Sequence, residues 1–220
     1  MIKAIIFDFD GLIIDTESVW YESYKETLKS YQFDLPLAEF GECIGSDETV
    51  LNTYFKKNLG ENCNVDEIET NAFNIYKTKM SSPEARIGVL EYLQEASEMG
   101  YKIGLASSSS KEWVTKYLNE LGLLNYFEVI VTRDDVKKVK PAPDLYLKAI
   151  KDLNINSSEA IAFEDSLNGS IAAMTAGLKC VIVPNPVTEL SAFENYSLRL
   201  KSMSEKSLSE VIDLIEKSKV

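Results

Sequence analysis

The stretch Phe7-Asp8-Phe9-Asp10-Gly11 decides how this chain of 220 residues is interpreted. The residues before it, Ile2 to Phe7, are mostly apolar and β-prone, which predicts a buried strand of a parallel sheet. Two carboxylates at the tip of such a strand are costly unless their charge is compensated, and a metal ion would compensate it. Ligands of open α/β sheets bind beyond the carboxyl ends of the strands, so chemistry is expected at this tip. The simpler alternative is that both acids are solvated in a loop.

The composition narrows the classes of function. Hydrophobic residues make up 45% of the chain, and its length suits one large domain or a core with one smaller insertion. The net charge of −12 disfavours nucleic acid and anionic membranes as partners, although local cations could still hold a small anionic substrate. The absence of histidine excludes histidine-ligated metals, phosphohistidine chemistry and Ser-His-Asp triads. Acid–base chemistry must therefore use carboxylates, Lys, Tyr or Cys.

Cysteine usage and the absence of targeting patterns predict a cytoplasmic protein. Cys43, Cys63 and Cys180 are few, odd in number and widely spaced, so neither a zinc site nor a disulfide framework is expected. Met1 leads straight into the first strand without a signal-peptide pattern. No apolar run approaches the ~18 residues that a membrane-spanning helix needs.

The periodicity of the sequence changes twice along the chain. After the first strand, apolar residues at helical spacing predict helices over 17–30, 49–59 and 65–80. From Pro83 onward strands and helices alternate, with strands expected over 101–106, 127–132, 160–163 and 179–183, and helices over 88–99, 111–121, 143–153, 168–176 and 207–217. Repeated βα units predict an α/β fold, a Rossmann-like parallel sheet with helices on both faces. We expect a core of residues 1–15 and 83–220, and an inserted α-helical cap of residues 16–82.

Four expected strand ends carry groups suited to phosphoryl transfer. In chain order they carry the pair Asp8 and Asp10, the run Ser107 to Ser110, Lys140 before Pro141-Ala142-Pro143-Asp144, and the pair Glu164 and Asp165. This inventory offers a nucleophile, oxygen ligands for a hard cation, and donors for phosphate oxygens.

These four motifs, in this order and over essentially the whole chain, resemble the haloacid dehalogenase (HAD) superfamily. The resemblance is to the branch with a helical cap after the first strand, which includes β-phosphoglucomutase and many sugar-phosphate phosphatases. Residues 8–17, Asp-Phe-Asp-Gly-Leu-Ile-Ile-Asp-Thr-Glu, are typical of the branch, although many members have Thr or Val in place of Leu12. The resemblance implies a Mg²⁺-dependent enzyme that acts on a small phosphorylated metabolite.

The resemblance implies separate roles for the first two acids. Asp8 matches the nucleophile that attacks phosphorus to form an aspartyl-phosphate. The alternative for Asp8 is metal binding alone. Asp10 matches the general acid/base, and two residues further along a strand its side chain points to the same face as that of Asp8. The alternative for Asp10 is a structural acid. A second acid also argues against dehalogenation, because haloacid dehalogenases lack it and need no metal.

The resemblance also implies the metal ligands. Glu164 and Asp165 match the family's metal-binding acids, and with Asp8 and the backbone carbonyl of Asp10 they would make an oxygen site suited to Mg²⁺. We expect Asp165 to be a direct ligand. Glu164 binds either directly or through water.

Three further residues match the phosphate-binding groups of the family. Ser107 matches the phosphate-binding hydroxyl, and the backbone N–H of Ser108 could assist it as an anion donor. Lys140 matches the lysine that offsets the phosphate charge. The neighbouring residues are assigned to helix capping (Ser109, Ser110) and to solvation (Lys137, Lys138).

In this branch the cap usually selects the substrate. The candidates that could face the site are Trp20, Tyr24, the loop Gly45-Ser46-Asp47-Glu48, Lys77 and Lys79. The alternative for the two aromatic residues is the core of the cap, and for the two lysines a solvated helix face. β-Phosphoglucomutase has a cap histidine where this chain has Trp20, and a cap arginine near the position of Asp47 and Glu48.

These departures favour a phosphatase that transfers the phosphoryl group to water. A phosphomutase is the alternative, and a catalytically idle binding protein on the same fold is the third hypothesis. We expect a monomer or weak dimer without nucleic acid or membrane partners.

Overall fold

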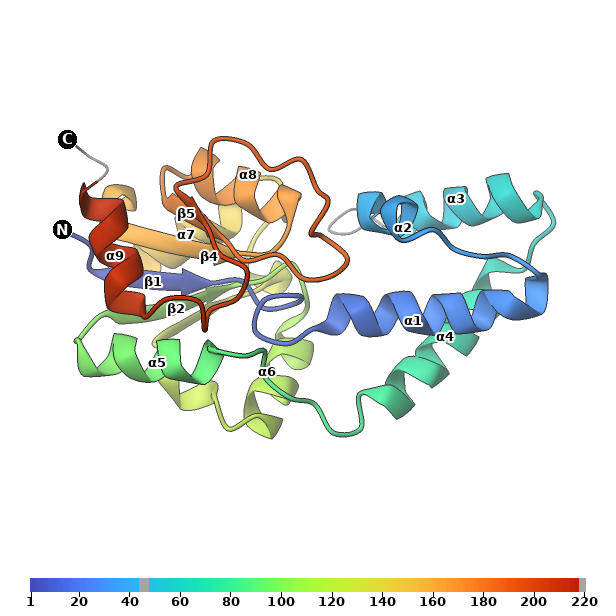
Figure 1. Cartoon of the computed structure of the whole chain (residues 1–220), viewed down its shortest axis with the longest axis horizontal. Coiled ribbons are helices and arrows are strands. Elements are labelled where there is room, and N and C mark those ends of the chain that lie inside the picture. The colour runs from blue at the N-terminus through green and yellow to red at the C-terminus, as the bar shows by residue number, and fades with distance from the viewer. Residues whose placement is uncertain (44–47, 218–220) are drawn as a thin grey trace.

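Six strands form one parallel sheet in the computed structural model, which describes residues 1–43 and 48–217 (Figure 1). The order is β3-β2-β1-β4-β5-β6, and every neighbouring pair is parallel. The strands are β1 (Ala4–Phe7), β2 (Lys102–Ala106), β3 (Val129–Val131), β4 (Ala160–Glu164), β5 (Lys179–Ile182) and β6 (Leu198–Arg199). The chain reverses its direction across the sheet between β1 and β4, and such a reversal creates a crevice at the carboxyl ends of these two strands.

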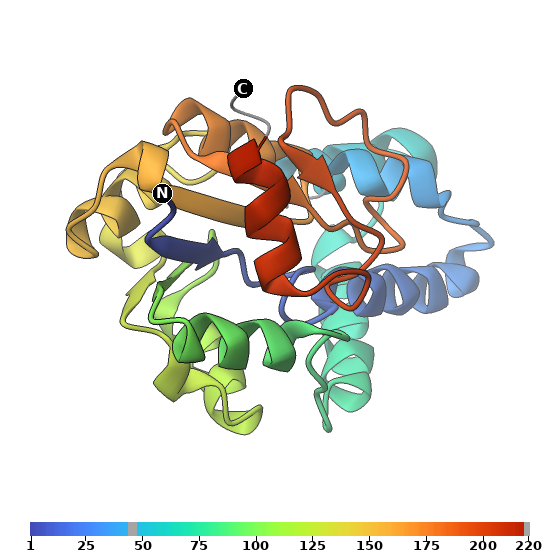
Figure 2. The same ribbon diagram turned by 60° about the vertical axis from the view of Figure 1, so that its left-hand side comes forward.

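Helices cover both faces of the sheet because side chains alternate along each strand. Ile5 and Phe7 of β1 point into the apolar cluster under α5 (Val89–Glu98), α6 (Lys111–Glu120) and α9 (Leu208–Lys217). Ala4 and Ile6 point into the opposite cluster, under α7 (Asp144–Asp152) and α8 (Leu167–Thr175). Figure 2 shows α9 in front of the sheet beside α5. The core therefore lies in two layers, one on each side of the sheet.

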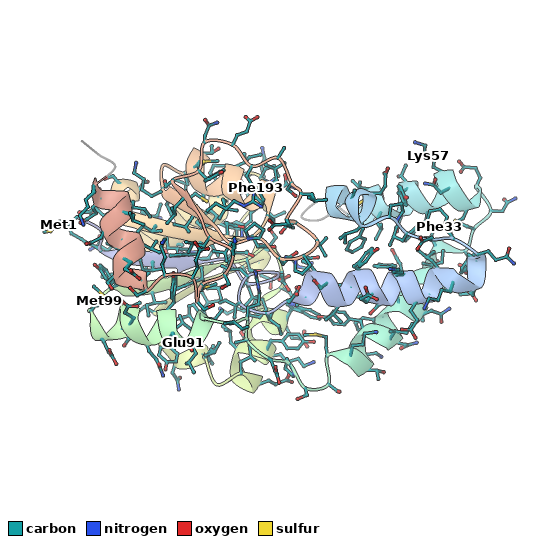
Figure 3. The ribbon with its side chains drawn as sticks, in the orientation of Figure 1. Met1, Phe33, Lys57, Glu91, Met99 and Phe193 are labelled. Atoms are coloured by element: carbon teal, nitrogen blue, oxygen red, sulfur yellow. The ribbon has the colours of Figure 1, made fainter. Side chains whose placement is uncertain are left out.

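The chain between β1 and α5 forms a separate group of helices that extends away from the sheet (Figure 1). We call α1 (Thr16–Leu28), α2 (Leu37–Cys43), α3 (Glu48–Leu59) and α4 (Val65–Lys79) the helical unit. It has its own apolar cluster, formed by Leu28, Leu35, Phe40, Phe55, Val65 and Ile68 together with Val187 from beyond β5. Phe33 is labelled toward the outer end of this unit in Figure 3, far from Met1 and Met99.

Two chain segments connect the helical unit to the sheet. The loop after β1 and the segment after α4 pair through an antiparallel bridge between Ile14 and Ala85, and the N–H of Arg86 donates to the carbonyl of Ile13 at 2.8 Å. Gly11 in the first segment has φ +80°, a conformation that favours glycine. The connection is therefore a short paired ribbon next to the end of β1.

The structure confirms the predicted α/β class. Each predicted strand and helix is present with small shifts at its ends. Among the α-helices and strands of the described residues, two were not predicted, the seven-residue helix α2 and the two-residue strand β6. None of the helices described is both long and apolar enough to cross a membrane.

Candidate active site

The acids of the first and last motifs meet at the end of the sheet. Phe7 of β1 is in register with Phe163 of β4, so Asp8 and Glu164 follow on neighbouring strands. Carboxylate oxygens of Asp8, Glu164 and Asp165 all lie within 4.8 Å of one another, and all three residues are buried. Buried carboxylates at such distances repel each other unless a cation lies among them.

Lys140 supplies one cation to this cluster. Its ammonium group pairs with Asp8 Oδ1 and, at 2.7 Å, with Glu164 Oε1. The Tyr146 hydroxyl also donates to Glu164 Oε1, and its ring lies under the ammonium group, 5.2 Å from Nζ to the centroid. Burial works against the charged form of Lys140, but the carboxylates of Asp8 and Glu164 outweigh it and hold its pKa above the usual value.

The pKa values of the acids indicate that one ammonium group is too little charge for the cluster. Burial raises the pKa of Asp8 to about 7, where Lys140 opposes the shift and Glu164 adds to it. Burial and the carboxylates of Asp8 and Glu164 also hold the pKa of Asp165 well above its usual value. If all three acids are ionised, they leave an excess of two negative charges over Lys140. That excess equals the charge of a divalent cation.

Asp165 has an oxygen available for such an ion. Its Oδ2 accepts a hydrogen bond of 2.7 Å from Asn185 Nδ2, whereas Oδ1 is buried without a hydrogen-bond partner. Gly11 and Gly169 make room for the acids, because a Cβ atom at either position would overlap with the carboxylate of Asp165 or of Glu164. Oxygen-only ligands, a spare buried oxygen and unbalanced negative charge all fit Mg²⁺.

Asp10 lies outside this cluster and accepts hydrogen bonds from a set of neutral donors. Its Oδ2 accepts from the Ser109 hydroxyl at 2.7 Å, and its Oδ1 from Trp113 Nε1 at 3.0 Å and from the Thr16 hydroxyl at 3.1 Å. The Ser107 hydroxyl lies 3.5 Å from Oδ2. The carboxylate of Asp10 is therefore held by several donors but does not belong to the group of Asp8, Glu164 and Asp165.

The serine run divides into different local functions. Ser107 is buried, and its hydroxyl accepts the N–H of Ser109 at 3.0 Å. Ser107 and Ser108 both line a cavity at the end of the sheet. Ser110 caps α6 by accepting the N–H of Trp113 at 3.3 Å, as predicted. Ser109 was also assigned to capping, and this was wrong, because its hydroxyl instead donates to Asp10. The Ser109 hydroxyl thereby links the segment after β2 to the residue Asp10 after β1.

All the predicted site residues except Glu164 line one cavity of about 360 Å³, and Glu164 is buried and pairs with Lys140, one of the lining residues. The other residues around the cavity are Thr16, Glu17, Trp20, Ser109, Ser110, Trp113, Arg133, Ser166 and Asn168. Lys137 and Lys138 are exposed and outside it, as expected.

The helical unit contributes fewer of its candidate residues to the cavity. Trp20 lines it, whereas Tyr24 stacks on Trp20 at 5.7 Å and packs within the unit. Lys77 lies over the ring of Phe73, and Lys79 pairs with Glu26 at 3.5 Å, so both lysines occupy a solvated helix face. The candidate loop Gly45-Ser46-Asp47-Glu48 lies outside the residues whose side chains the structure describes.

Comparison with known proteins assigns the family. A model of the haloacid dehalogenase-like hydrolase family matches residues 5–183. The chain belongs to this family. The Bacillus subtilis (strain 168) protein named "Putative phosphatase YhcW" is 48% identical over 214 residues, which cover 97% of each chain. A "Phosphorylated carbohydrates phosphatase" of Thermotoga maritima is 29% identical over 188 residues, which cover 80% of this chain and 82% of that protein.

A solved structure supports the same assignment. The crystal structure of CbbY from Rhodobacter sphaeroides, as an Asp-to-Asn variant in complex with xylulose-(1,5)bisphosphate, has a TM-score of 0.76 and 26% identity. The match covers 95% of this chain and 98% of CbbY. The family match and the relatives together make this HAD-family chain a phosphoric monoester hydrolase.

Sequence reasoning missed several residues around the site of this HAD-family enzyme. Trp113 donates a hydrogen bond to Asp10, Asn185 donates one to Asp165, and Arg133 lines the cavity. None of these three residues belongs to a motif that could be recognised in the sequence. Glu17 was quoted only as part of the first motif. It lines the cavity, and burial, with Asp10 and Asp8 nearby, raises its pKa to about 8. The signal for that shift in the sequence was the presence of three acids, Asp8, Asp10 and Asp15, within ten residues upstream.

Proposed function

We propose that the protein is a Mg²⁺-dependent phosphatase that hydrolyses a small phosphate monoester, a sugar phosphate or similar metabolite, through an aspartyl-phosphate on Asp8. The observation that carries the proposal is the buried group of Asp8, Glu164 and Asp165 with Lys140 paired to two of them. The T. maritima relative named for phosphorylated carbohydrates and the CbbY complex with a sugar bisphosphate support the substrate class.

Asp8 is the nucleophile in this proposal. One of its carboxylate oxygens attacks phosphorus, the ester P–O bond breaks, and the phosphoryl group is carried on Asp8. Lys140 offsets the charge of the nucleophile and of the arriving phosphate oxygens. The Ser107 hydroxyl and the N–H of Ser108 are the proposed donors to those oxygens, and both residues line the cavity.

Asp8, Asp165 and Glu164, with the backbone carbonyl of Asp10, would hold Mg²⁺. When bound, the ion supplies positive charge that stabilises the phosphoryl oxygens. Asp165 is the proposed direct ligand because its Oδ1 is buried and has no other partner. Glu164 accepts from Lys140, Tyr146 and Ser166, which leaves it better suited to fix the lysine or to bind through water.

Asp10 is the proposed general acid and base. It gives a proton to the leaving alcohol oxygen in the first half of the reaction. In the second half it takes a proton from the water that attacks the phosphorus of aspartyl-phosphate, which releases inorganic phosphate and restores Asp8. Its place beside Asp8 but outside the acidic group suits a residue that exchanges protons rather than one that binds metal.

The helical unit is the proposed cap of residues 16–82 over a core of residues 1–15 and 83–220. A cavity of about 360 Å³ suits a small ester and excludes bulky polyanions. Of the described residues, the cations that line it are Lys140 and Arg133, both from outside the helical unit. A mutase must hold a second phosphate group during the reaction. The described part of the helical unit places no cation at the cavity for such a group, which supports transfer of the phosphoryl group to water.

The test is phosphate release from p-nitrophenyl phosphate and from a hexose 1-phosphate, each with Mg²⁺ and with EDTA. We expect Mg²⁺-dependent release of inorganic phosphate by the native enzyme and none by Asp8→Asn. Formation of an isomeric sugar phosphate in place of inorganic phosphate would support the phosphomutase alternative. Undiminished activity of Asp8→Asn would contradict the proposed nucleophile.

A further inference from the structure

Aromatic rings from the helical unit and from the sheet region stack across the boundary between them. The Trp20 ring of α1 lies 4.2 Å from that of Tyr76 of α4, centroid to centroid, with an interplanar angle of 17°. The Tyr76 ring lies in turn 5.8 Å from that of Trp113 of α6, at 28°. Tyr76 is fully buried although it belongs to the helical unit. These rings therefore form a continuous column from α1 to α6.

The last ring of the column, that of Trp113, contacts Asp10, the proposed general acid and base. Trp113 Nε1 donates a hydrogen bond of 3.0 Å to Asp10 Oδ1. The Trp113 ring also meets Tyr117 edge to face, with ring centroids 4.8 Å apart and an interplanar angle of 70°. Because the indole contacts both Tyr76 and Tyr117, it cannot rotate without losing ring contacts. The direction of its N–H, and hence of one bond to Asp10, is set by this packing.

The other donors to Asp10 lack this connection. Ser109 donates from the turn before α6, and Thr16 from the first residue of α1, and both are short hydroxyl side chains that no ring contact holds. A hydroxyl can turn to follow a displaced carboxylate, whereas the indole N–H points in one direction. Of these three donors, Trp113 is the one that can impose an orientation on Asp10.

We propose that Trp113 is a positioning residue that aims the Asp10 carboxylate at the leaving oxygen, and that Tyr76 of the helical unit holds Trp113 in the required orientation. The inference rests on the proposed acid/base role of Asp10. It makes proton donation depend on the seating of the helical unit against α6. A displacement of α4 would remove the Tyr76 ring from Trp113 and release the indole from one side.

Comparing two esters with different leaving groups distinguishes a loss of proton donation from general damage to the site. The leaving oxygen of p-nitrophenyl phosphate departs without a proton, whereas that of benzyl phosphate, an ester of similar size, needs one. The value of kcat/KM covers steps only up to the departure of the alcohol. A defect in the acid therefore lowers kcat/KM for benzyl phosphate selectively, and a loss of packing or of metal lowers both values alike.

The experiment compares kcat/KM for the two esters in the native enzyme and in three variants. Trp113→Phe keeps a ring but loses the N–H, and we expect a loss of roughly tenfold or more with benzyl phosphate and of about threefold or less with p-nitrophenyl phosphate. Tyr76→Leu removes the ring that holds Trp113 and should show the same selective loss. Tyr76→Phe is its matched control, because it keeps the ring that stacks on Trp113, and it should retain the native ratio.

Asp10→Asn lacks the proposed acid and therefore shows how large the selective loss with benzyl phosphate is when proton donation is removed. Thermal unfolding verifies that each variant is folded. If Asp10→Asn shows no selective loss, the proposed acid role is wrong and this inference is overturned with it. If Asp10→Asn shows the selective loss and Trp113→Phe keeps the native ratio, or loses equally with both esters, the positioning role alone is overturned. A native ratio in folded Tyr76→Leu would overturn the part assigned to the helical unit.

Discussion

Glu17 illustrates how the crowded negative charge of the site acts on a single side chain. It lies in the first turn of α1, half-buried at the cavity, and burial, with Asp10 and Asp8 nearby, raises its pKa from 4.5 to about 8. The folded state therefore binds this proton more tightly than the unfolded state does. The resulting contribution to stability is fully present below pH 4.5 and is lost as the pH rises through about 8.

This sign makes a prediction for Glu17→Gln, which cannot ionise. In EDTA, the midpoint of thermal unfolding should fall more steeply for the native protein than for Glu17→Gln as the pH rises from 4.5 to about 8. Thermal unfolding followed by circular dichroism over that range measures the difference. Curves that stay parallel would show that Glu17 does not titrate in this window.

At the residue scale, the sequence allowed prediction of those site residues that belong to a motif at the end of a predicted strand. Asp8, Lys140 and Glu164 were expected together, and the structure places their side chains in contact. Trp113 and Asn185 were not expected, because their hydrogen bonds depend on how a helix face and a distant loop pack against the site. A long-range contact of this kind leaves no periodic signal in the chain.

At the element scale, α8 shows how helix packing limits the site. Its residue Gly169 lies against the Glu164 carboxylate, and a Cβ atom there would overlap with it. The helix can approach the end of β4 only because this position lacks a side chain. Glu164 in turn fixes Lys140, so the spacing of α8 affects two groups of the site.

Gly169→Ala should therefore displace Glu164 and weaken metal binding. We expect the Mg²⁺ concentration for half-maximal activity to rise by about 10- to 100-fold, as for other lost contacts around metal ligands. Mg²⁺ titration of phosphatase activity measures this. Ser170→Ala, one residue further along the same helix, is the control and should keep the native requirement. An unchanged requirement in Gly169→Ala would show that Glu164 has no part in holding the metal.

The elements that were not predicted are short. The helix α2 has seven residues and the strand β6 has two, too few for either periodicity to appear. Their formation depends on tertiary packing. Phe40 of α2 enters the apolar cluster of the helical unit, and β6 pairs with β5. By contrast, the longer elements of the sheet region have strong periodicity, and their order alone predicted the parallel sheet.

At the scale of the whole molecule, Arg86 joins three segments at the base of the helical unit. Its guanidinium donates to the carbonyl of Gly11, to that of Val183 at 3.1 Å and to that of Pro184 at 2.7 Å. The return segment from α4 is thereby tied to the loop after β1 and to the end of β5. The planar fork of arginine suits this geometry, and a lysine could not reach all three acceptors.

Arg86→Lys should lower the free energy of unfolding by about 1–3 kcal/mol, because carbonyls are left without their donors. Urea unfolding measures the loss. Arg199→Lys is the matched control, since Arg199 pairs with Glu189 at the surface, and its effect should stay within about 0.5 kcal/mol. Equal effects of the two substitutions would contradict the role given to Arg86.

The central claim is that Asp8 and Asp165 share a divalent cation at the end of β1. A crystal structure determined in the presence of Mg²⁺ tests it most directly. The account predicts one ion at about 2.1 Å from an oxygen of each of these two carboxylates. An ion bound elsewhere, or side chains at positions 8 and 165 too far apart to share one, would contradict it.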